Sequence, residues 1–176
     1  MEEVLDESGI EQAVATLAAA ILARLGDKPF FLVGIRSRGD DVARRLAAKL
    51  KDAGVDRPLG VLDISLYRDD FAHLHENPKL QSSDIPFPVD GAHLVIVDDV
   101  LFTGRTIRAA LDAIMDYGRP EKIELAVLID RGHRELPIAP DYVGATLQTT
   151  RRDFVIVELR ETDGAERVTL QRRDQA

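Results

Sequence analysis

Apolar and polar residues fall along the chain in blocks that predict strands and helices in alternation. Short unbroken apolar runs predict buried strands over Phe30–Ile35, His93–Val97 and Ile123–Ile129. The alternating segment Leu59–Tyr67 predicts one more strand. Apolar residues at helical spacing predict helices over Ser8–Leu25, Asp40–Leu50 and Arg105–Tyr117. Strands that alternate with helices imply an α/β fold, in which a mostly parallel central sheet is flanked by helices on both faces.

The remaining segments complete the predicted organisation. A late hairpin is predicted by Phe154–Leu159 and Arg167–Leu170, which are joined around Asp163-Gly164. From Arg68 to Gly91 the sequence is polar and interrupted by prolines and serines. So long an irregular stretch inside a compact domain indicates a functional lid or a disordered segment. With no internal repeat and no long linker, residues 1–176 are expected to form a single domain.

Composition narrows the classes of function. The chain has no cysteine, which excludes disulfides, thiolate metal sites and thiol catalysis. No apolar run approaches the roughly 20 residues that a membrane helix needs, and the acidic N-terminus is the reverse of a secretory signal peptide. A cytoplasmic protein with no membrane partner is therefore expected. The net charge of −8 repels polyanions, so any nucleic-acid binding must rest on a local basic surface.

The segment after Val97 carries the strongest chemical signal. The apolar strand is followed by Asp98 and Asp99 and then by a Thr-Gly-Arg-Thr turn, residues 103–106, that opens a helix. Backbone N–H groups at a helix N-terminus can cradle a phosphate, and Gly104 lets the backbone approach closely. Paired carboxylates accept hydrogen bonds from sugar hydroxyls. Two acids alone could equally cap the helix, but the strand, the diacid and the turn in fixed order favour a phosphosugar site.

This stretch, VIVDDVLFTGRT, resembles the signature with which type I phosphoribosyltransferases bind phosphoribosyl pyrophosphate (PRPP). The resemblance implies that Asp98 and Asp99 hold the ribose 2- and 3-hydroxyls as the catalytic residues, and that the Thr-Gly turn holds the 5-phosphate. The PRPP- and UMP-binding residues that it implies are Asp98, Asp99, Val100, Leu101, Phe102, Thr103, Gly104, Arg105 and Thr106. Hypoxanthine-guanine enzymes carry a carboxylate where this chain has Phe102, which counts against a 6-oxopurine substrate.

Further segments are similar to the bifunctional PyrR family, which comprises pyrimidine operon attenuators with uracil phosphoribosyltransferase activity. They are GIRSRG at 34–39, LDISLYRDD at 62–70 and DRGHRELPI at 130–138, within a match from Val4 to Val157. The resemblance implies a type I phosphoribosyltransferase fold with a flexible lid at about 69–90 and a small hood made by the N- and C-terminal segments. It also implies conversion of uracil and PRPP to UMP and diphosphate. Mg²⁺ would be held mainly by PRPP, with no protein metal site, and the protein would be a homodimer or a higher homo-oligomer.

The same resemblance assigns residues around the PRPP loop. The turn at 34–39 is expected to bind pyrophosphate through Ser37 and Arg38, since guanidinium groups suit that anion. A solvated pair of arginines at a helix start is the alternative. Two acids that follow directly, Asp40 and Asp41, would repel pyrophosphate unless they serve the helix N-terminus. The flexible loop is expected to begin with Arg68, Asp69 and Asp70, and the base to lie near Arg131 and Val155.

The second activity implied by the resemblance is binding of pyrimidine operon leader RNA when UMP is present. Its candidate contacts here are His133, Arg134, Arg151 and Arg152. Polar or basic positions typical of the family are instead occupied by Ala15, Ala19, Ala139 and Ala145. Two hypotheses therefore stand: a UMP-sensing RNA-binding regulator with uracil phosphoribosyltransferase activity, or a salvage phosphoribosyltransferase without RNA binding.

Overall fold

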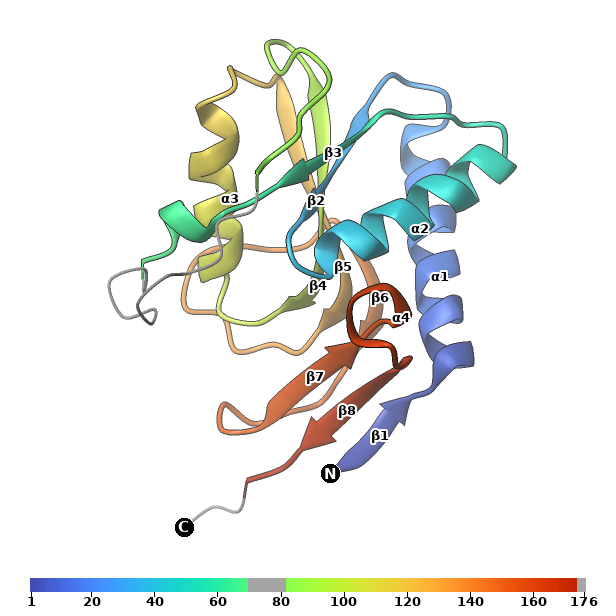
Figure 1. Ribbon diagram of the computed structural model, residues 1–176, viewed down its shortest axis with the longest axis vertical. Helices are drawn as coiled ribbons and strands as arrows, with labels where there is room; N and C mark the ends of the chain where they lie inside the picture. Colours follow the sequence, from blue (N-terminus) through green and yellow to red (C-terminus); the bar gives the residue numbers. More distant parts are fainter. Residues whose placement is uncertain (70–81, 174–176) are drawn as a thin grey trace.

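A five-stranded parallel sheet forms the centre of the molecule (Figure 1). The structure is a computed structural model, and it describes residues 1–69 and 82–173. The strands lie in the order β3-β2-β4-β5-β6. Their bounds are β2 Phe31–Ile35, β3 Leu59–Leu62, β4 His93–Leu101, β5 Lys122–Asp130 and β6 Tyr142–Thr146. Each neighbouring pair is parallel, which confirms the predicted α/β architecture.

Helices cover both faces of this sheet. On one face α1 (Glu7–Leu25) and α2 (Gly39–Asp52) pack against the apolar side chains that the strands turn toward them. On the other face α3 (Arg105–Met115) packs against the alternate residues of the same strands. In β4, for example, Val95 belongs to the first core and Ile96 to the second. The near-continuous apolar strands in the sequence follow from this burial on both faces.

The long helix α1 shows why sequence length alone misleads about membranes. Among the described residues it is the single helix that is long and apolar enough to span a bilayer, although the sequence predicts no membrane helix. Its apolar face, however, is already occupied, because Ile10, Leu17 and Ile21 are fully buried in the core. The helix starts where the side chain of Asp6 accepts a hydrogen bond from the N–H of Gly9 (2.8 Å).

A second, antiparallel sheet forms the hood and joins the two ends of the chain. Its strand order is β1-β8-β7, with bounds β1 Glu2–Leu5, β7 Phe154–Glu158 and β8 Arg167–Gln171. The predicted hairpin is present as β7 and β8, connected by the short helix α4 (Arg160–Asp163) and by Gly164 at φ 69°. Figure 1 shows the hood at one end of the parallel sheet, with β1 and β8 side by side.

The larger differences between the predicted elements and the structure concern four strands. The strand predicted over Leu59–Tyr67 ends at Leu62, and a 3-10 turn, η1, occupies Ser65–Tyr67. The chain turns there because the carboxylate of Asp63 accepts hydrogen bonds from the N–H and the hydroxyl of Ser65 (2.9 and 2.6 Å). Strand β4 continues four residues beyond the predicted end at Val97. Strands β1 and β6 had no predicted counterpart.

Candidate active site

The two acids lie within β4, not beyond its end. Asp98 and Val100 still pair with β5, opposite Val127 and Ile129. Asp98 is only 4% exposed, and its Oδ1 accepts the N–H of Asp99 at 2.9 Å. The carboxylate of Asp99 accepts the N–H of Val100 at 2.8 Å. The local hydrogen bonds fix both carboxylates on a rigid strand, so the geometry of any sugar bound to them is set by the sheet.

Burial dominates the electrostatics of the pair. It raises the pKa of Asp98 well above the usual value, and the neighbouring negative charge of Asp99 raises it further. Burial also raises the pKa of Asp99, although hydrogen bonds and the positive charge of Arg38 oppose that rise. Arg38 therefore acts electrostatically on the diacid across the site.

Helix α2 begins directly against the diacid. A Cβ placed on Gly39 would lie 2.7 Å from the carbonyl oxygen of Val97 and 3.0 Å from Oδ1 of Asp98, so only glycine fits there. This contact brings the preceding turn, with Ser37 exposed and Arg38 half-buried, to the side of β4 where the acids lie. The structure thus unites the predicted pyrophosphate loop with the predicted sugar site.

The Thr-Gly turn opens α3 as the sequence predicts. Gly104 has φ 93° and precedes the first helical residue, Arg105. Around the turn is a cavity of about 210 Å³, and it is lined by Arg68, Asp69, Thr103, Arg105 and Thr106. Arg105 closes its rim through ion pairs with Asp69 (2.8 Å) and Glu135 (3.2 Å). Asp70, also predicted for this loop, lies outside the described residues.

A larger cavity of about 730 Å³ opens on the hood side of β4. Its lining includes the two residues predicted near the base, Arg131 and Val155, together with Val100 and Phe102. The guanidinium of Arg131 lies 3.9 Å from the centre of the Phe102 ring. It donates to the carbonyl oxygens of Asp153 (2.8 Å) and Thr150 (2.7 Å). Burial lowers the pKa of Arg131. Phe102 and the Arg131 guanidinium stacked on it therefore line a slot beside the diacid.

Known proteins match this architecture over nearly the whole chain. The family described as "Phosphoribosyl transferase domain" matches residues 1–162. "Bifunctional protein PyrR" of Pelotomaculum thermopropionicum is 53% identical over 170 residues, which cover 96% of this chain and 94% of the relative. The protein of the same name from Akkermansia muciniphila is 52% identical over 169 residues, 96% of this chain and 95% of the relative. The chain belongs to the bifunctional PyrR family.

Solved structures agree with this family at the level of fold. A hypoxanthine-guanine phosphoribosyltransferase of Bacillus anthracis superposes with a TM-score of 0.72 at 16% identity, covering 96% of each chain. The enzyme of Leishmania tarentolae, in complex with GMP, gives 0.73 at 18% identity and covers 98% of this chain and 97% of its own. At such identities the likeness shows the shared fold, as expected for a type I phosphoribosyltransferase.

In this PyrR family member the loop of DRGHRELPI encloses the PRPP turn. The side chain of Arg134 donates to the carbonyl oxygens of Phe102 (2.9 Å) and Ile138 (3.1 Å) and to the carboxylate of Asp130 (2.7 Å). The backbone N–H of Glu135 donates to the carbonyl oxygen of Thr103 at 2.9 Å. These contacts tie the Thr-Gly turn, the predicted PRPP turn, to the loop that follows β5.

The predicted RNA-contact residues separate into two kinds. His133 and Arg134 point inward, because Nε2 of His133 lies 2.7 Å from the carbonyl oxygen of Thr149 and Arg134 holds the PRPP turn. Arg151 and Arg152 are exposed at the rim of the large cavity. Arg151 also forms an ion pair with Glu135. Only the second kind offers guanidinium groups to an external phosphate.

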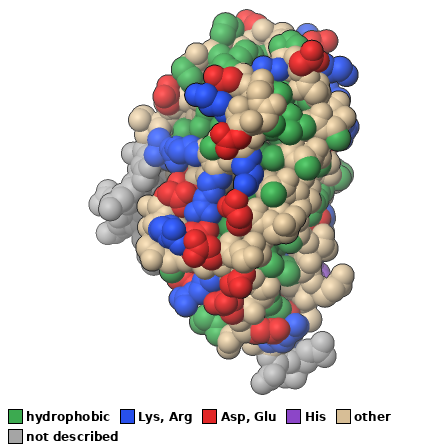
Figure 2. All heavy atoms as spheres, turned by 90° about the vertical axis from the view of Figure 1, so that its right-hand side faces the viewer, with side chains coloured by type: hydrophobic (Ala, Val, Ile, Leu, Met, Phe, Trp, Pro, Cys, Tyr) green, Lys and Arg blue, Asp and Glu red, His purple; other side chains and the backbone are tan. Residues whose placement is uncertain are grey.

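The alanines noted in the sequence lie on accessible surface. Ala19 and Ala139 are exposed, and Ala15 and Ala145 are partly exposed. Figure 2 looks onto the side of the molecule that carries α1, and it shows basic side chains interspersed with acidic ones rather than gathered. Lys49 with Glu11, for example, forms an ion pair on this side. The surface of α1 therefore lacks a concentrated positive charge among its described residues.

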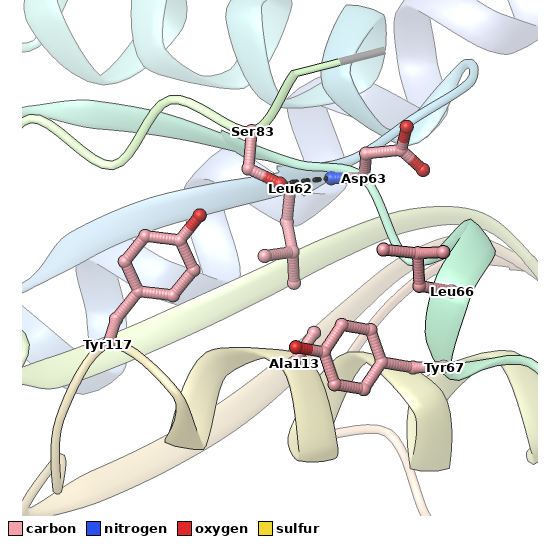
Figure 3. A pocket seen from close by; sticks show the side chains of 7 residues that line it. All are labelled: Leu62, Asp63, Leu66, Tyr67, Ser83, Ala113 and Tyr117. Carbon is pink, nitrogen blue, oxygen red and sulfur yellow. Dashed lines mark hydrogen bonds between the residues drawn. The ribbon is translucent and has the colours of Figure 1, made fainter. Parts of the chain in front are cut away.

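Another cavity lies away from the residues described above. Figure 3 shows it between β3, η1 and α3, with a volume of about 230 Å³. It is lined by Leu62, Asp63, Leu66, Tyr67, Ser83, Ala113 and Tyr117. The hydroxyl oxygen of Ser83 accepts the N–H of Asp63 at 2.8 Å and draws the two segments together. No residue predicted for the site lines this cavity.

Sequence reasoning missed two acids that hold the cations of the site. Asp163 in the hood forms a bidentate ion pair with Arg38. Asp153 receives Arg131 through its backbone carbonyl and accepts the N–H of Thr150 through its side chain (2.7 Å). Both are far from their partners in sequence, so no local motif could have joined them. The hairpin prediction placed Asp163 at a turn but gave it no role.

Proposed function

We propose that this PyrR family member transfers the phosphoribosyl group of PRPP to uracil and binds pyrimidine operon leader RNA in response to UMP. The observation that carries the proposal is the diacid Asp98–Asp99 on a rigid strand, with the cavity at the Thr-Gly turn on one side and the larger cavity lined by Arg131 and Phe102 on the other. Full-length relatives named "Bifunctional protein PyrR" at about half identity support the same reading.

In the proposed reaction, different parts of the site bind the phosphate, the ribose and the base. The N–H groups and hydroxyls of residues 103–106 bind the 5-phosphate. Asp98 and Asp99 accept the ribose hydroxyls and stabilise the positive charge that develops at the anomeric carbon. Uracil, placed in the slot between Phe102 and Val155, forms its bond from N1 to that carbon while the bond to diphosphate breaks. The proton of N1 passes to solvent, and UMP and diphosphate are the products.

Magnesium fits this site as a partner of the substrate. Among the described residues no group of three or more His, Cys, Asp or Glu side chains is placed to hold a metal ion. Mg²⁺ prefers octahedral oxygen coordination shared between substrate phosphates and one or two carboxylates, and the substrate oxygens above Asp98 and Asp99 suit it. When bound, it supplies positive charge to the departing diphosphate. The protein adds Arg38 on the same side.

An assay with radiolabelled uracil and PRPP tests the enzyme, run beside guanine, adenine and orotate. We expect UMP formation with uracil alone. The double substitution of Asp98→Asn with Asp99→Asn should lower the rate at least 1,000-fold, because both acceptors and the charge that stabilises the transition state are lost. Circular dichroism of the double variant is expected to match the wild type. Wild-type rates in that variant would contradict the assignment of Asp98 and Asp99 to the active site.

A salvage enzyme without RNA binding is the second candidate. The alanines on α1 and the inward-facing Arg134 favour it. Filter binding of a pyrimidine leader RNA with and without UMP, over a salt series, separates the two. The regulator requires UMP-dependent affinity that falls as salt rises. An RNA affinity that depends neither on UMP nor on salt would favour the salvage enzyme.

We also propose that the protein works in the cytoplasm as a homodimer or a higher homo-oligomer. A chain without cysteine and with the apolar face of α1 buried in its own core suits that compartment. Sedimentation equilibrium at several concentrations measures the assembly. A monomer at all concentrations would contradict it.

A further inference from the structure

Three consecutive residues of the hood contact the N-terminal half of α2 and the residue that precedes it. Glu161 pairs with Arg45 (2.6 Å), the hydroxyl of Thr162 donates to the carboxylate of Asp41 (2.5 Å), and Asp163 pairs with Arg38. A fourth residue of the hood, Glu166, also pairs with Arg45. The pyrophosphate loop and the hood, more than 100 residues apart in sequence, are thus joined by a row of charged contacts.

Asp163 is the member of this row that reaches the site. Its Oδ2 accepts Nε of Arg38 at 3.0 Å and its Oδ1 accepts Nη2 at 2.8 Å. The same carboxylate accepts the N–H of Leu159 at 2.8 Å, so the acid is fixed from its own side. The pair raises the pKa of Arg38 and lowers that of Asp163. Two parallel hydrogen bonds also define the plane of the guanidinium.

The pairing leaves part of Arg38 available. A guanidinium has five N–H donors, of which Asp163 takes two. The remaining donors belong to a residue that directly precedes Gly39, which packs against Val97 and Asp98. The positive charge of Arg38 also opposes the rise in the pKa of Asp99. Arg38 has a backbone φ of 72°, a conformation that a non-glycine residue rarely adopts without support. The ion pair between the Arg38 side chain and Asp163 of the hood stabilises this backbone conformation.

The neighbouring acids do not oppose an anion here. Arg44 donates to Asp40 and to Asp41, each at 3.1 Å, and Thr162 donates to Asp41. Both acids are buried in the first turn of α2 and are partnered on its outer side. These contacts offset the repulsion expected from the sequence, and the positive charge of Arg38 acts on Asp99.

We propose that Asp163 is a positioning residue for the diphosphate of PRPP, because it fixes the guanidinium of Arg38 in the orientation that binds this group. The proposal rests on the proposed function and adds a residue from the hood to its site. Without the carboxylate, Arg38 would have to lose its side-chain freedom when the substrate binds, which costs affinity. UMP carries no diphosphate, so its binding would not depend on this contact.

The test compares ligands with and without a diphosphate. Asp163→Asn keeps the size of the side chain and an acceptor for Leu159 but loses the charged bidentate pair. We expect the KM for PRPP to rise about tenfold, the size of effect that corresponds to one charge-assisted contact. The Kd of diphosphate with Mg²⁺, measured by calorimetry, should rise by the same factor. The Kd of UMP should stay within twofold of the wild type.

Glu161→Gln is the matched control, because it removes the neighbouring charge of the same turn, whose partner is Arg45. It should change none of the three constants. If Asp163→Asn does not fold, Asp163→Glu keeps the charge but displaces the carboxylate by one methylene, and the same split between diphosphate and UMP is expected. An unchanged PRPP KM, or equal losses for UMP and diphosphate, would overturn the proposal. A wild-type protein that makes no UMP would instead contradict the proposed function, and the calorimetric comparison would still be informative.

Discussion

At the scale of single residues, the diacid is held in an environment that disfavours its charge. Asp98 is almost fully buried next to a second carboxylate, and burial raises the pKa of both. If the pair binds sugar hydroxyls and a cationic centre, as we propose, part of the acceptor capacity of both carboxylates must stay unused beforehand. The free energy of unfolding is lowered as a consequence, which is a common relation between activity and stability.

Asp98→Asn should therefore raise the thermal midpoint at pH 7 to 8. A folded-state pKa above the unfolded value means that the acid contributes stability below its unfolded pKa, and this contribution is lost as the pH rises toward the folded pKa. The asparagine can still accept the N–H of Asp99. Thermal unfolding from pH 4 to pH 8 measures the effect, and the gain should shrink toward pH 4. A gain that is the same at every pH would contradict the assignment to charge burial.

Arg134 gives a second prediction at this scale. Arg134→Met removes hydrogen bonds to Phe102, Ile138 and Asp130 at once and frees the PRPP turn. UMP formation should fall at least tenfold together with any RNA binding, because buried hydrogen bonds of a charged group contribute about 1.5–3 kcal/mol each. Steady-state kinetics and filter binding measure the two. Loss of RNA binding alone would make Arg134 a direct contact with RNA.

At the scale of elements, the strands and helices that are long and buried could be predicted from the sequence. The apolar run predicts β4 and the helical spacing predicts α1, because in each element the apolar residues of the pattern are those buried in the core. Asp98 and Asp99 could be placed near the sheet edge but not within β4, because pairing with β5 extends the strand beyond its apolar part.

The missed elements lack a local pattern for a physical reason. β6 (Tyr142–Thr146) contains Gly144, whose Cβ would lie 2.6 Å from the carbonyl oxygen of Leu128, so the strand depends on a close approach to β5. β1 (Glu2–Leu5) is acidic and becomes a strand only by pairing with β8, at the other end of the chain. Contacts of this kind are tertiary, and no window of the sequence contains them.

The junction between α2 and the hood yields a prediction of stability. Arg45→Met would leave Glu166, whose side chain is 8% exposed, without its cation. The free energy of unfolding should fall by about 3 kcal/mol, because a buried carboxylate without a partner is costly. Lys49→Met is the control, since its partner Glu11 is 64% exposed and the loss should stay below about 1 kcal/mol. Urea denaturation compares the two, and equal losses would contradict the role of burial.

At the scale of the whole molecule, the charge pattern restricts where RNA could bind. The net charge is −8, and basic residues on the α1 side alternate with acids. The rim of the large cavity differs, because Arg151, Arg152 and Arg173 line it together. Within the described part of the chain, Arg152 has no ion-pair partner. The rim lies beside the expected base slot, so a bound nucleotide and an RNA phosphate would be near neighbours.

Arg152→Ala should accordingly weaken UMP-dependent RNA binding and reduce its dependence on salt. One lost contact with single-stranded RNA changes the slope of log affinity against log salt by about 0.7. Filter binding at several salt concentrations provides the slope. Lys28→Ala, which changes an exposed residue in the turn after α1, should leave the slope unchanged. Equal slopes for wild type and Arg152→Ala would place the RNA elsewhere.

The pairing of β1 with β8 has a consequence for synthesis on the ribosome. Strand β1 leaves the exit tunnel long before its partner, because among the described residues Glu2–Leu5 pairs with Arg167–Gln171. The parallel sheet and its PRPP turn can assemble while translation continues, but Asp163 reaches Arg38 only once the hood closes. A nascent chain would therefore assemble the sheet that carries Asp98 and Asp99 before it could form the ion pair between Arg38 and Asp163.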